Sequence, residues 1–340
     1  MKANIMVKNA WYALGLSNEF EPGHLHGQKI VGKPIVLWRT ATGKVVAFDD
    51  RCAHKRMPLS EGKLLTKGDV LECAYHGFCY NAEGVCVGIP SMPDGPIPPQ
   101  ARLKAYPVIE QDGVVWIWPG HVDKMGEAQP PRTPEIAASA WESISSGPLF
   151  IRANTRLLIE NLLDITHFYP LHDGNIGDFA NSQIPIEVVE ETIDGNWSVK
   201  SIRRADNYQQ PPYFVDWFGY EVVDRFHTHC MMNPGVTRVE LRVAPPGQLG
   251  TDADRGYVLY HTHTPVDESN HIWRWCMNCR VEHRAGSDPS KSLAQRITET
   301  FPAVVEEDRW ALEKQQAMFA YPDDGYEEVL IGSDETMQRA

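Results

Sequence analysis

Two short Cys/His pairs constrain this chain more than any other feature of its sequence. Cys52 and His54 form the first pair, and after eighteen intervening residues Cys73 and His76 complete the second. Zinc can bind two Cys and two His, but zinc fingers usually pair Cys with Cys and His with His along the chain. In a mixed-ligand [2Fe-2S] centre, two His replace two Cys on one iron, and two Cys–His loops satisfy that arrangement. We therefore favour a [2Fe-2S] cluster over zinc.

The residues around these pairs agree with a tight metal-binding loop. Gly77 follows the second pair and permits a sharp backbone turn close to the sulfur atoms. Cys79 and Cys86 lie nearby but outside the pattern, and we expect them to be packing thiols. The Cys276-x-x-Cys279 pair has no second half, and on a strand its sulfur atoms face opposite sides of the sheet. We expect ordinary packing there too.

Composition excludes several classes of protein. The net charge is 32 − 45 = −13, which argues against nucleic acid or an anionic membrane surface as the main partner. No run of about 18 apolar residues predicts a membrane span, and no basic start followed by an apolar stretch predicts a signal peptide. Seven cysteines in a long chain without such a leader predict a reducing cytoplasm with free or metal-bound thiols.

The first third of the chain reads as short strands. Runs rich in β-branched residues, broken by turn signals, predict an all-β unit. The polar stretch 119–134 contains four prolines and predicts a linker, so we expect domains at 1–122 and 123–340. The expected strands are 30–31, 35–39, 44–49, 70–73, 78–80, 106–110 and 113–118.

The second part begins and ends with expected helices, at 153–168 and 291–319. Between them lies a long block of strands, which predicts an antiparallel sheet with helices packed on it and an α+β fold class overall. These expected strands are 186–193, 197–203, 226–232, 237–244, 256–265 and 270–281.

A second cluster of polar residues falls on the first of these helices. Asn161, Asp164 and His167 recur every third residue, so we expect them on one side of the helix. Pro170 perturbs the helix, and His172 follows from the next turn. Two imidazoles can then converge on one metal ion.

A non-haem Fe(II) site of this kind needs a carboxylate beside its two histidines. Asp308 falls on the apolar stripe of the last expected helix, where an unpaired carboxylate is costly. The competing interpretation is a solvated acidic patch at 306–308. The stripe is formed by Phe301, Val304, Val305, Ala311 and Leu312.

Further histidines form two H-x-H pairs on expected strands, at 227–229 and 261–263. Residues i and i+2 share one face of a sheet, so each pair could bind metal, but we expect them to line a pocket or pack in the sheet. Other residues expected to line a substrate pocket are Arg204, Glu240, Arg242 and Trp273.

Taken with their order and separation, both motifs resemble the Rieske non-haem iron oxygenases of the vanillate and dicamba O-demethylase group. The resemblance runs over nearly the whole chain. It rests on K-N-A-W-Y near the start, C-A-H-K-R-M-P-L-S, C-A-Y-H-G-F-C-Y-N, V-W-I-W-P-G, N-L-L-D-I-T-H and E-E-D-R. One departure is Lys55, which stands where many members have Arg directly after the first histidine.

The resemblance implies particular roles for these residues. It makes His167, His172 and Asp308 the ligands of a mononuclear Fe(II), Asp164 a bridging carboxylate and Asn161 a polar neighbour. It also implies a helix-grip catalytic domain. Family members form head-to-tail homotrimers in which that carboxylate would link His76 of one subunit to His167 or His172 of the next. His261 precedes Thr-Pro at a spacing similar to that of a substrate-contacting histidine in the O-demethylases.

The implied function is that of a terminal oxygenase, an NAD(P)H- and O2-dependent monooxygenase or demethylase. It would hydroxylate or O-demethylate a small aromatic substrate, with an aromatic acid as the expected class. The chain has no G-x-G-x-x-G loop, so the electrons must come from a separate reductase, with or without a ferredoxin. The alternatives are a ring cis-dihydroxylating dioxygenase and, less favoured, a Rieske electron carrier without oxygenase activity.

Overall fold

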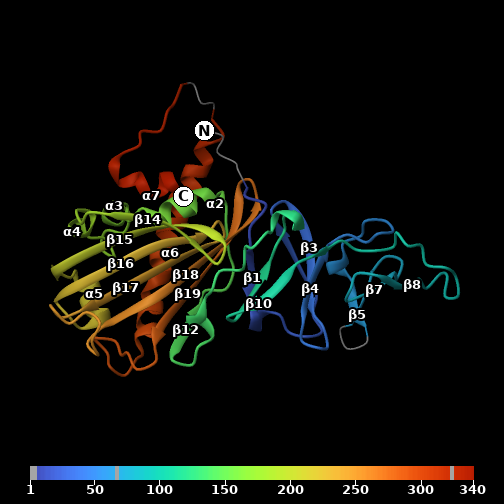
Figure 1. The fold of residues 1–340 in the computed structure, drawn as a ribbon, viewed down its shortest axis with the longest axis horizontal. Helices are drawn as coiled ribbons and strands as arrows, with labels where there is room; N and C mark the ends of the chain where they lie inside the picture. Colours follow the sequence, from blue (N-terminus) through green and yellow to red (C-terminus); the bar gives the residue numbers. More distant parts are fainter. Residues whose placement is uncertain (1–5, 66–68, 322–324) are drawn as a thin grey trace.

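The N-terminal part of the chain folds into three small antiparallel sheets (Figure 1). The computed structural model describes residues 6–65, 69–321 and 325–340. The strand orders of the sheets are β1-β11-β10, β2-β3-β4-β9 and β5-β6-β7-β8. Their bounds are β1 Tyr12–Leu16, β2 His26–Ile30, β3 Lys33–Arg39, β4 Val45–Asp49, β5 Lys63–Leu65, β6 Val70–Glu72, β7 Cys79–Asn81, β8 Cys86–Gly88, β9 Ala105–Tyr106, β10 Val108–Gln111 and β11 Val114–Ile117.

Most of the expected strands are present, with two kinds of difference. The strand expected at 30–31 is wrong in its second residue, because Val31 (φ 49°) and Gly32 (φ 76°) form the turn into β3. A tight hairpin turn needs positive φ at both positions, and this requirement overrides the β preference of valine. β1, β5 and β8 are additional short strands that the sequence pattern did not predict.

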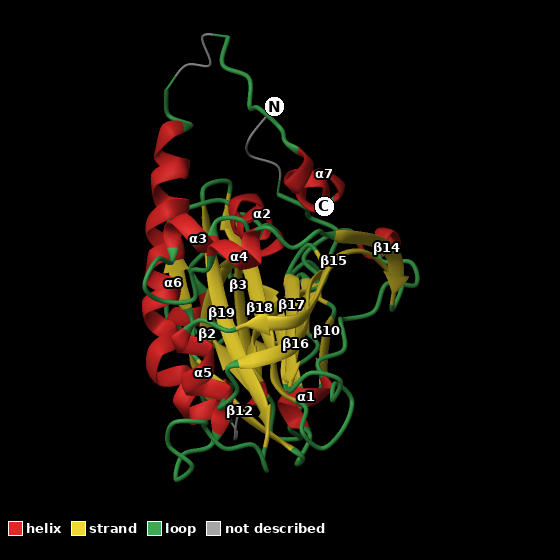
Figure 2. Ribbon diagram, turned by 90° about the vertical axis from the view of Figure 1, so that its left-hand side faces the viewer, coloured by secondary structure: helices red, strands yellow, loops and turns green. Residues whose placement is uncertain are grey.

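The C-terminal part is built on one large antiparallel sheet, with strand order β12-β19-β18-β17-β16-β15-β14 and β13 paired beside β12 on β19. The long helix α6 (Leu293–Met318) lies along one face of this sheet (Figure 2). This confirms the expected α+β fold class, with an antiparallel sheet flanked by helices. The strands are β12 Trp141–Ser145, β13 Leu149–Ile151, β14 Glu187–Ile193, β15 Asn196–Gln209, β16 Val222–Asn233, β17 Val236–Ala244, β18 Arg255–Asp267 and β19 Asn270–Arg280.

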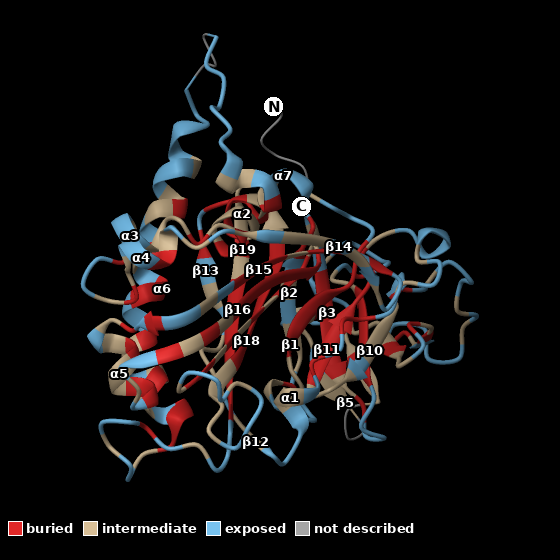
Figure 3. Cartoon of the chain, turned by 60° about the vertical axis from the view of Figure 1, so that its left-hand side comes forward, coloured by how far each residue is buried: buried red, intermediate tan, exposed pale blue. Residues whose placement is uncertain are grey.

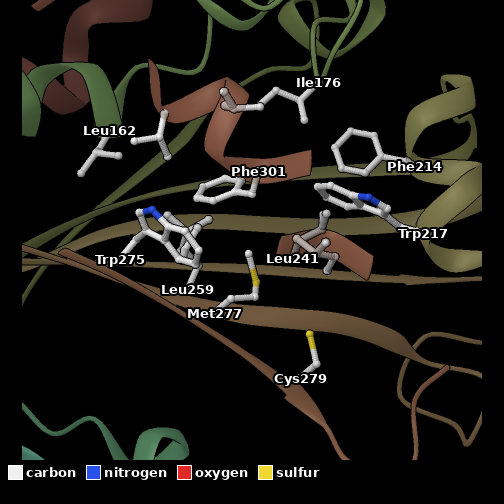
Figure 4. Packing of buried hydrophobic residues seen from close by; sticks show 14 of the residues in the cluster. Leu162, Ile176, Phe214, Trp217, Leu241, Leu259, Trp275, Met277, Cys279 and Phe301 are labelled. Atoms are coloured by element: carbon white, nitrogen blue, oxygen red, sulfur yellow. The ribbon is translucent and has the colours of Figure 1, made fainter. Parts of the chain in front are cut away.

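The sheet and α6 enclose the largest hydrophobic core. Alternate residues of each strand point to the same face, so Val239, Leu259 and Met277 align across β17, β18 and β19. Phe301 of α6 packs on this row, and its ring meets that of Trp275 edge-on at 5.2 Å (Figure 4). Figure 3 shows the result: β16 and β18 are largely buried, whereas α3 (Phe168–Leu171) and α4 (Phe179–Ser182) are mostly exposed or half-buried.

The helix expected at 153–168 is wrong as a single element. α2 spans Thr155–Leu163 and starts at Asn154, whose side chain accepts a hydrogen bond from the Leu157 amide. Asp164 adopts an extended conformation and ends α2, and α3 begins after His167. The additional helices are α1 Pro134–Ala137, α5 Pro212–Phe218 and α7 Glu335–Arg339.

The two parts share contacts and a core. The Val31 amide donates to the Pro265 carbonyl at 2.8 Å, which ties the β2–β3 turn to β18. Trp11 and Trp116 pack in one cluster with Met232 and Tyr260 of the large sheet. The boundary near residue 122 stays a prediction. None of the helices in the described part of the chain is long and apolar enough to cross a membrane.

Candidate metal centres

The two Cys/His loops have the same backbone design. The Cys52 amide donates to the Met57 carbonyl, and the Cys73 amide donates to the Phe78 carbonyl, both at 2.9 Å. In each loop the residue four places after the cysteine donates back to the cysteine carbonyl at 3.0 Å. That residue has positive φ in both loops: 62° at Arg56 and 69° at Gly77. A Cβ on Gly77 would lie 2.7 Å from Pro90, so this close contact, and not the positive φ that Arg56 also adopts, requires glycine there.

These loops hold the thiols inside and the imidazoles outside. Cys52 and Cys73 are each 2% exposed, whereas His54 and His76 are exposed. The Cys73 thiol lies within hydrogen-bonding reach of Cys52, and the two imidazole rings lie 4.4 Å apart. Tyr80 holds the loop from within, since its hydroxyl lies 3.3 Å from the Cys52 sulfur. The side chains therefore group as two sulfurs and two imidazoles.

This grouping fits two metal ions better than one. Within residues 6–65, 69–321 and 325–340, one group of three or more metal-ligating side chains has all its ligand atoms within 4.8 Å of one another, and it consists of His167, His172 and Asp308. The four loop residues do not converge on one point, as four ligands of a single zinc ion must. A [2Fe-2S] cluster takes the sulfurs on one iron and the imidazoles on the other.

The second group of ligands is buried where α2, α3 and α6 meet. Asp308 is 6% exposed and His172 is fully buried. The Asp308 Oδ1 atom lies 3.3 Å from His172 Nε2 and 3.5 Å from His167 Nε2. Two ligands at right angles on one metal, each bonded at about 2.1 Å, lie about 3.0 Å apart. The three residues therefore fit a two-His, one-carboxylate iron site, in which both Nε2 atoms already face the Asp308 carboxylate.

Neighbouring side chains fix the orientation of these ligands. Glu307 Oε2 lies 2.7 Å from His172 Nδ1, and its other oxygen accepts a hydrogen bond from Asn175 at 2.6 Å. Asn161 donates to Asp308 Oδ1 at 2.9 Å. Sequence reasoning identified Asn161 but missed Glu307, because nothing in the sequence said which face of α6 His172 would meet.

The electrostatics of this group favour a positive charge at its centre. Burial alone would raise the pKa of Asp308, but hydrogen bonding to His167 and His172 overcomes burial and holds that pKa below its ordinary value. Burial lowers the pKa of His172, and the carboxylates of Asp308 and Glu307 reverse this and raise it. A divalent cation would replace the protons that these carboxylates attract.

Asp164 is not where a continuous helix would place it. Because α2 ends at Leu163, Asp164 does not share one helical face with Asn161 and His167, and that expectation is wrong. Its carboxylate accepts hydrogen bonds from the Thr166 amide at 2.8 Å and the Thr166 hydroxyl at 2.6 Å. Asp164 is half-buried at the edge of the site.

Of the histidines in the two H-x-H pairs, His261 lies near the candidate iron site, and the others are held in the strands of the large sheet. His261 is buried and accepts a hydrogen bond from Trp273 Nε1 at 3.0 Å, and its ring centre is 6.5 Å from that of Phe301. His227 and His229 share one face of β16, with their Nε2 atoms 3.0 Å apart. His263 is fully buried on β18. Neither H-x-H pair belongs to a group of three ligands among the residues described.

Three residues expected in a substrate pocket lie elsewhere. Arg204 is exposed, because its strand neighbour Arg203 takes the inner face. Glu240 and Arg242 flank the inward-facing Leu241 and instead line a surface cavity of about 740 Å³. The period of two along a strand was visible in the sequence, but the face that turns inward was not. Trp273, the fourth, is fully buried.

Comparison with known proteins places both parts of the chain. Residues 10–107 match the Rieske [2Fe-2S] domain, and residues 151–340 match the vanillate O-demethylase oxygenase C-terminal domain. The iron-sulfur subunit TsaM1 of the toluene-4-sulfonate monooxygenase system of Comamonas testosteroni is 28% identical over 93% of this chain and 90% of its own. The vanillate O-demethylase oxygenase subunit of a Pseudomonas species (strain HR199) is 28% identical over 93% and 88%.

A solved structure agrees over almost the entire length. Dicamba monooxygenase bound to dicamba has a TM-score of 0.85 and 26% identity, covering 98% of this chain and 95% of that one. These matches confirm the expected enzyme class and its cofactors, a Rieske cluster and a non-haem iron reduced by NAD(P)H through a reductase. The chain belongs to the vanillate O-demethylase oxygenase family, the oxygenase components of Rieske monooxygenase systems.

Proposed function

We propose that this chain binds a mononuclear Fe(II) through His167, His172 and Asp308 and uses it to hydroxylate or O-demethylate a small aromatic acid. The observation that supports this most is the convergence of these three ligand side chains beside the inner face of the large sheet. The bound iron would supply O2 activation, fed with electrons from the Rieske cluster at Cys52, His54, Cys73 and His76.

The protein's own contribution is to orient and shield. Glu307 would hold the His172 ring through Nδ1, leaving Nε2 for the metal, and Asn161 would hold Asp308. Phe168 packs against both His167 and His172, with ring centres 5.0 and 5.5 Å away, and excludes water from that side. His261 is buried near Asp308 and is the candidate substrate contact, a neutral imidazole because burial lowers its pKa to about 3.

The electron path would run between subunits. In one chain the strands β5, β7 and β8 around the cluster loops lie at the opposite end of the molecule from α3 (Figure 1). Asp164 would therefore bridge His76 of one subunit to an iron ligand of the next in a head-to-tail homotrimer. His172 Nδ1 is already held by Glu307, whereas His167 Nδ1 has no hydrogen-bond partner in the described part of the chain, so His167 is the better candidate for the bridge.

The organisation follows from these roles. Residues 1–122 would form the electron-accepting domain, and residues 123–340 the catalytic domain. A separate reductase, with or without a ferredoxin, would pass electrons to the cluster in residues 1–122. All seven cysteines are free of disulfides, which supports a reducing cytoplasm as the location.

The test is a substrate screen with a surrogate reductase, measuring O2 uptake and formaldehyde. Formaldehyde released from methoxybenzoates in step with O2 uptake is the expected result. A cis-diol product would show ring dihydroxylation instead. A reducible cluster with no substrate-dependent O2 uptake would reduce the chain to an electron carrier.

A further inference from the structure

Two buried arginines beside the candidate iron site have no carboxylate partner. Arg203 on β15 is 3% exposed and Arg225 on β16 is 2% exposed. Neither forms an ion pair with any Asp or Glu in the described ranges 6–65, 69–321 and 325–340. Asp164 and Asp178 influence them from beyond ion-pair distance. Burial of an unpaired charge is strongly unfavourable, so these guanidiniums require an explanation.

The cluster around these arginines carries net positive charge. The register of β15 and β16 places Arg203 opposite His227 on the inner face of the sheet. Arg225 Nη2 lies 3.4 Å from His227 Nδ1. Burial lowers the pKa of His227, and that of His229 to about 3, so both imidazoles are neutral. Burial lowers the pKa of both arginines only to about 10, so both keep their charge at neutral pH.

The unpartnered atoms around Arg225 are mostly donors. Among the residues that the structure describes, Arg225 Nε and Nη1 have no hydrogen-bond acceptor, and the same is true of the Tyr208 hydroxyl and Trp217 Nε1. The guanidinium carbon lies 4.8 Å from the ring centre of Phe214 and 5.4 Å from that of Tyr208. Aromatic rings thus pack against the guanidinium while its N–H groups stay unpaired. Buried donors without acceptors are what an oxyanion satisfies.

The same region adjoins the metal ligands. The Phe168 ring lies 5.5 Å from that of His172 and 6.3 Å from that of His229. Figure 4 shows Phe214 and Trp217 of α5 on the same side of the sheet as Phe301 and Leu241. An aromatic ring held between these groups would have apolar contacts along its length and cationic donors at one end.

We propose that Arg225, supported by Arg203, binds the carboxylate or sulfonate of an aromatic substrate whose ring packs against Tyr208, Phe214 and Trp217. This inference rests on the proposed function and narrows it, because it makes the anionic group a requirement for binding. Recognition would use the N–H groups of a planar guanidinium already held by aromatic rings.

The experiment measures equilibrium binding by calorimetry without O2, so it does not depend on turnover. The probes are 4-methoxybenzoate, toluene-4-sulfonate and the neutral 4-methoxybenzamide. Arg225→Met is expected to weaken binding of both anions at least about 30-fold and to leave the amide unchanged. Arg204→Met, an exposed arginine one residue from Arg203 on the same strand, is the matched control and should change neither by more than about twofold.

A stability measurement separates a ligand-binding role from a structural one. Removing an unpaired buried charge should leave the ligand-free thermal midpoint of Arg225→Met unchanged or raise it. A lower midpoint together with unchanged anion binding would overturn the proposal. If Arg225→Met does not fold, Arg225→Lys and Arg203→Met take its place, and each must weaken the two anions selectively.

Asp178 is the rival partner of Arg225, because its Oδ2 atom is buried without a hydrogen bond. Asp178→Asn should leave 4-methoxybenzoate binding unchanged or tighter. If Asp178→Asn destabilises the protein, and Arg225→Met still binds 4-methoxybenzoate as tightly as the unmodified protein, the Arg225–Asp178 pair is structural and the proposal fails. Tight anion binding without O2 uptake would contradict the proposed oxygenase function but not this anion site. Rapid turnover of neutral methoxyarenes that Arg225→Met does not change would contradict the anion site but not the oxygenase function.

Discussion

The two metal-binding regions of this chain are built in opposite ways. At the cluster loops the imidazoles of His54 and His76 are exposed, and the neighbouring Tyr75 is 64% exposed. At the iron site His172 is fully buried and Asp308 is 6% exposed. The first region presents its imidazoles because electrons would pass from the cluster to the iron of the next subunit. The second region must keep water from the reaction, so it hides them.

The regions also differ in how far apart their parts lie in the sequence. Each cluster loop is closed by hydrogen bonds within six residues. The iron site joins His167 on one short segment to Asp308 on α6, and it depends on the large sheet to bring them together. A local change should therefore leave one region intact while it disables the other.

The largest effect should come from Asp308→Asn. The substitution removes the charged ligand from a site whose two other ligands are neutral imidazoles, so we expect loss of mononuclear iron and at least about a 1,000-fold loss of substrate-dependent O2 uptake. The visible spectrum of the Rieske cluster should not change. The ratio of total iron to Rieske cluster measures the loss of mononuclear iron, and the visible absorption spectrum shows whether the cluster is intact.

Glu306→Gln is the matched control, because Glu306 is an exposed carboxylate two residues away on α6. It should keep full iron content and activity. Retained iron in Asp308→Asn would contradict the proposed ligand set.

A second substitution should interrupt electron transfer between the two regions while both keep their metal. Asp164→Asn keeps the side-chain shape and both metals but removes the charge proposed to bridge the subunits. We expect electron transfer from the cluster to slow about 100-fold, the upper range for loss of an orienting carboxylate. Single-turnover oxidation of the reduced cluster gives the rate. Full-speed transfer in this variant would refute the bridge.

Glu307→Gln should have a smaller effect. The amide can still contact His172 Nδ1 but no longer offers a negative charge to that imidazole. Iron affinity should fall about 10-fold, with the Rieske spectrum unchanged. Titration of the metal-free protein with Fe(II) measures the change. An unaltered affinity would limit Glu307 to packing.

The contrast also explains what the sequence could predict. The Rieske domain was predictable because Cys52, His54, Cys73 and His76 lie on two short loops with a diagnostic spacing, and the comparisons confirm that domain, while these four ligands stay a prediction. Six of the eight strands of the large sheet, β14 to β19, followed from their β-branched runs, whereas β12 and β13 were not predicted. Both depend on local physics.

What failed depends on tertiary contacts. The break of the helix at Asp164 has no proline or glycine to announce it, and Asp164 instead bonds to Thr166. The choice of Arg203 over Arg204 as the inward residue is one of register, and one residue of shift exchanges the two faces. Glu307 became visible only once α6 met His172.

The smallest predicted effect concerns acid stability, and it comes from two buried histidines of the large sheet that supports the second region. His263 and His271 are fully buried, and burial lowers their pKa to about 3 and about 4. The unfolded chain binds protons at these histidines below about pH 6.5 while the folded protein does not, so stability falls as pH drops below 6.5, by up to about 1.4 kcal/mol per pH unit for each.

His271→Asn keeps an N–H group that can donate to the Ala153 carbonyl. Its urea midpoint should therefore fall less steeply between pH 6.5 and 4.5 than that of the unmodified protein. His24→Asn, at an exposed position near β2, is the control and should leave the slope unchanged. An equal slope in both variants would mean that the buried imidazoles of the large sheet do not cause the loss of stability in acid.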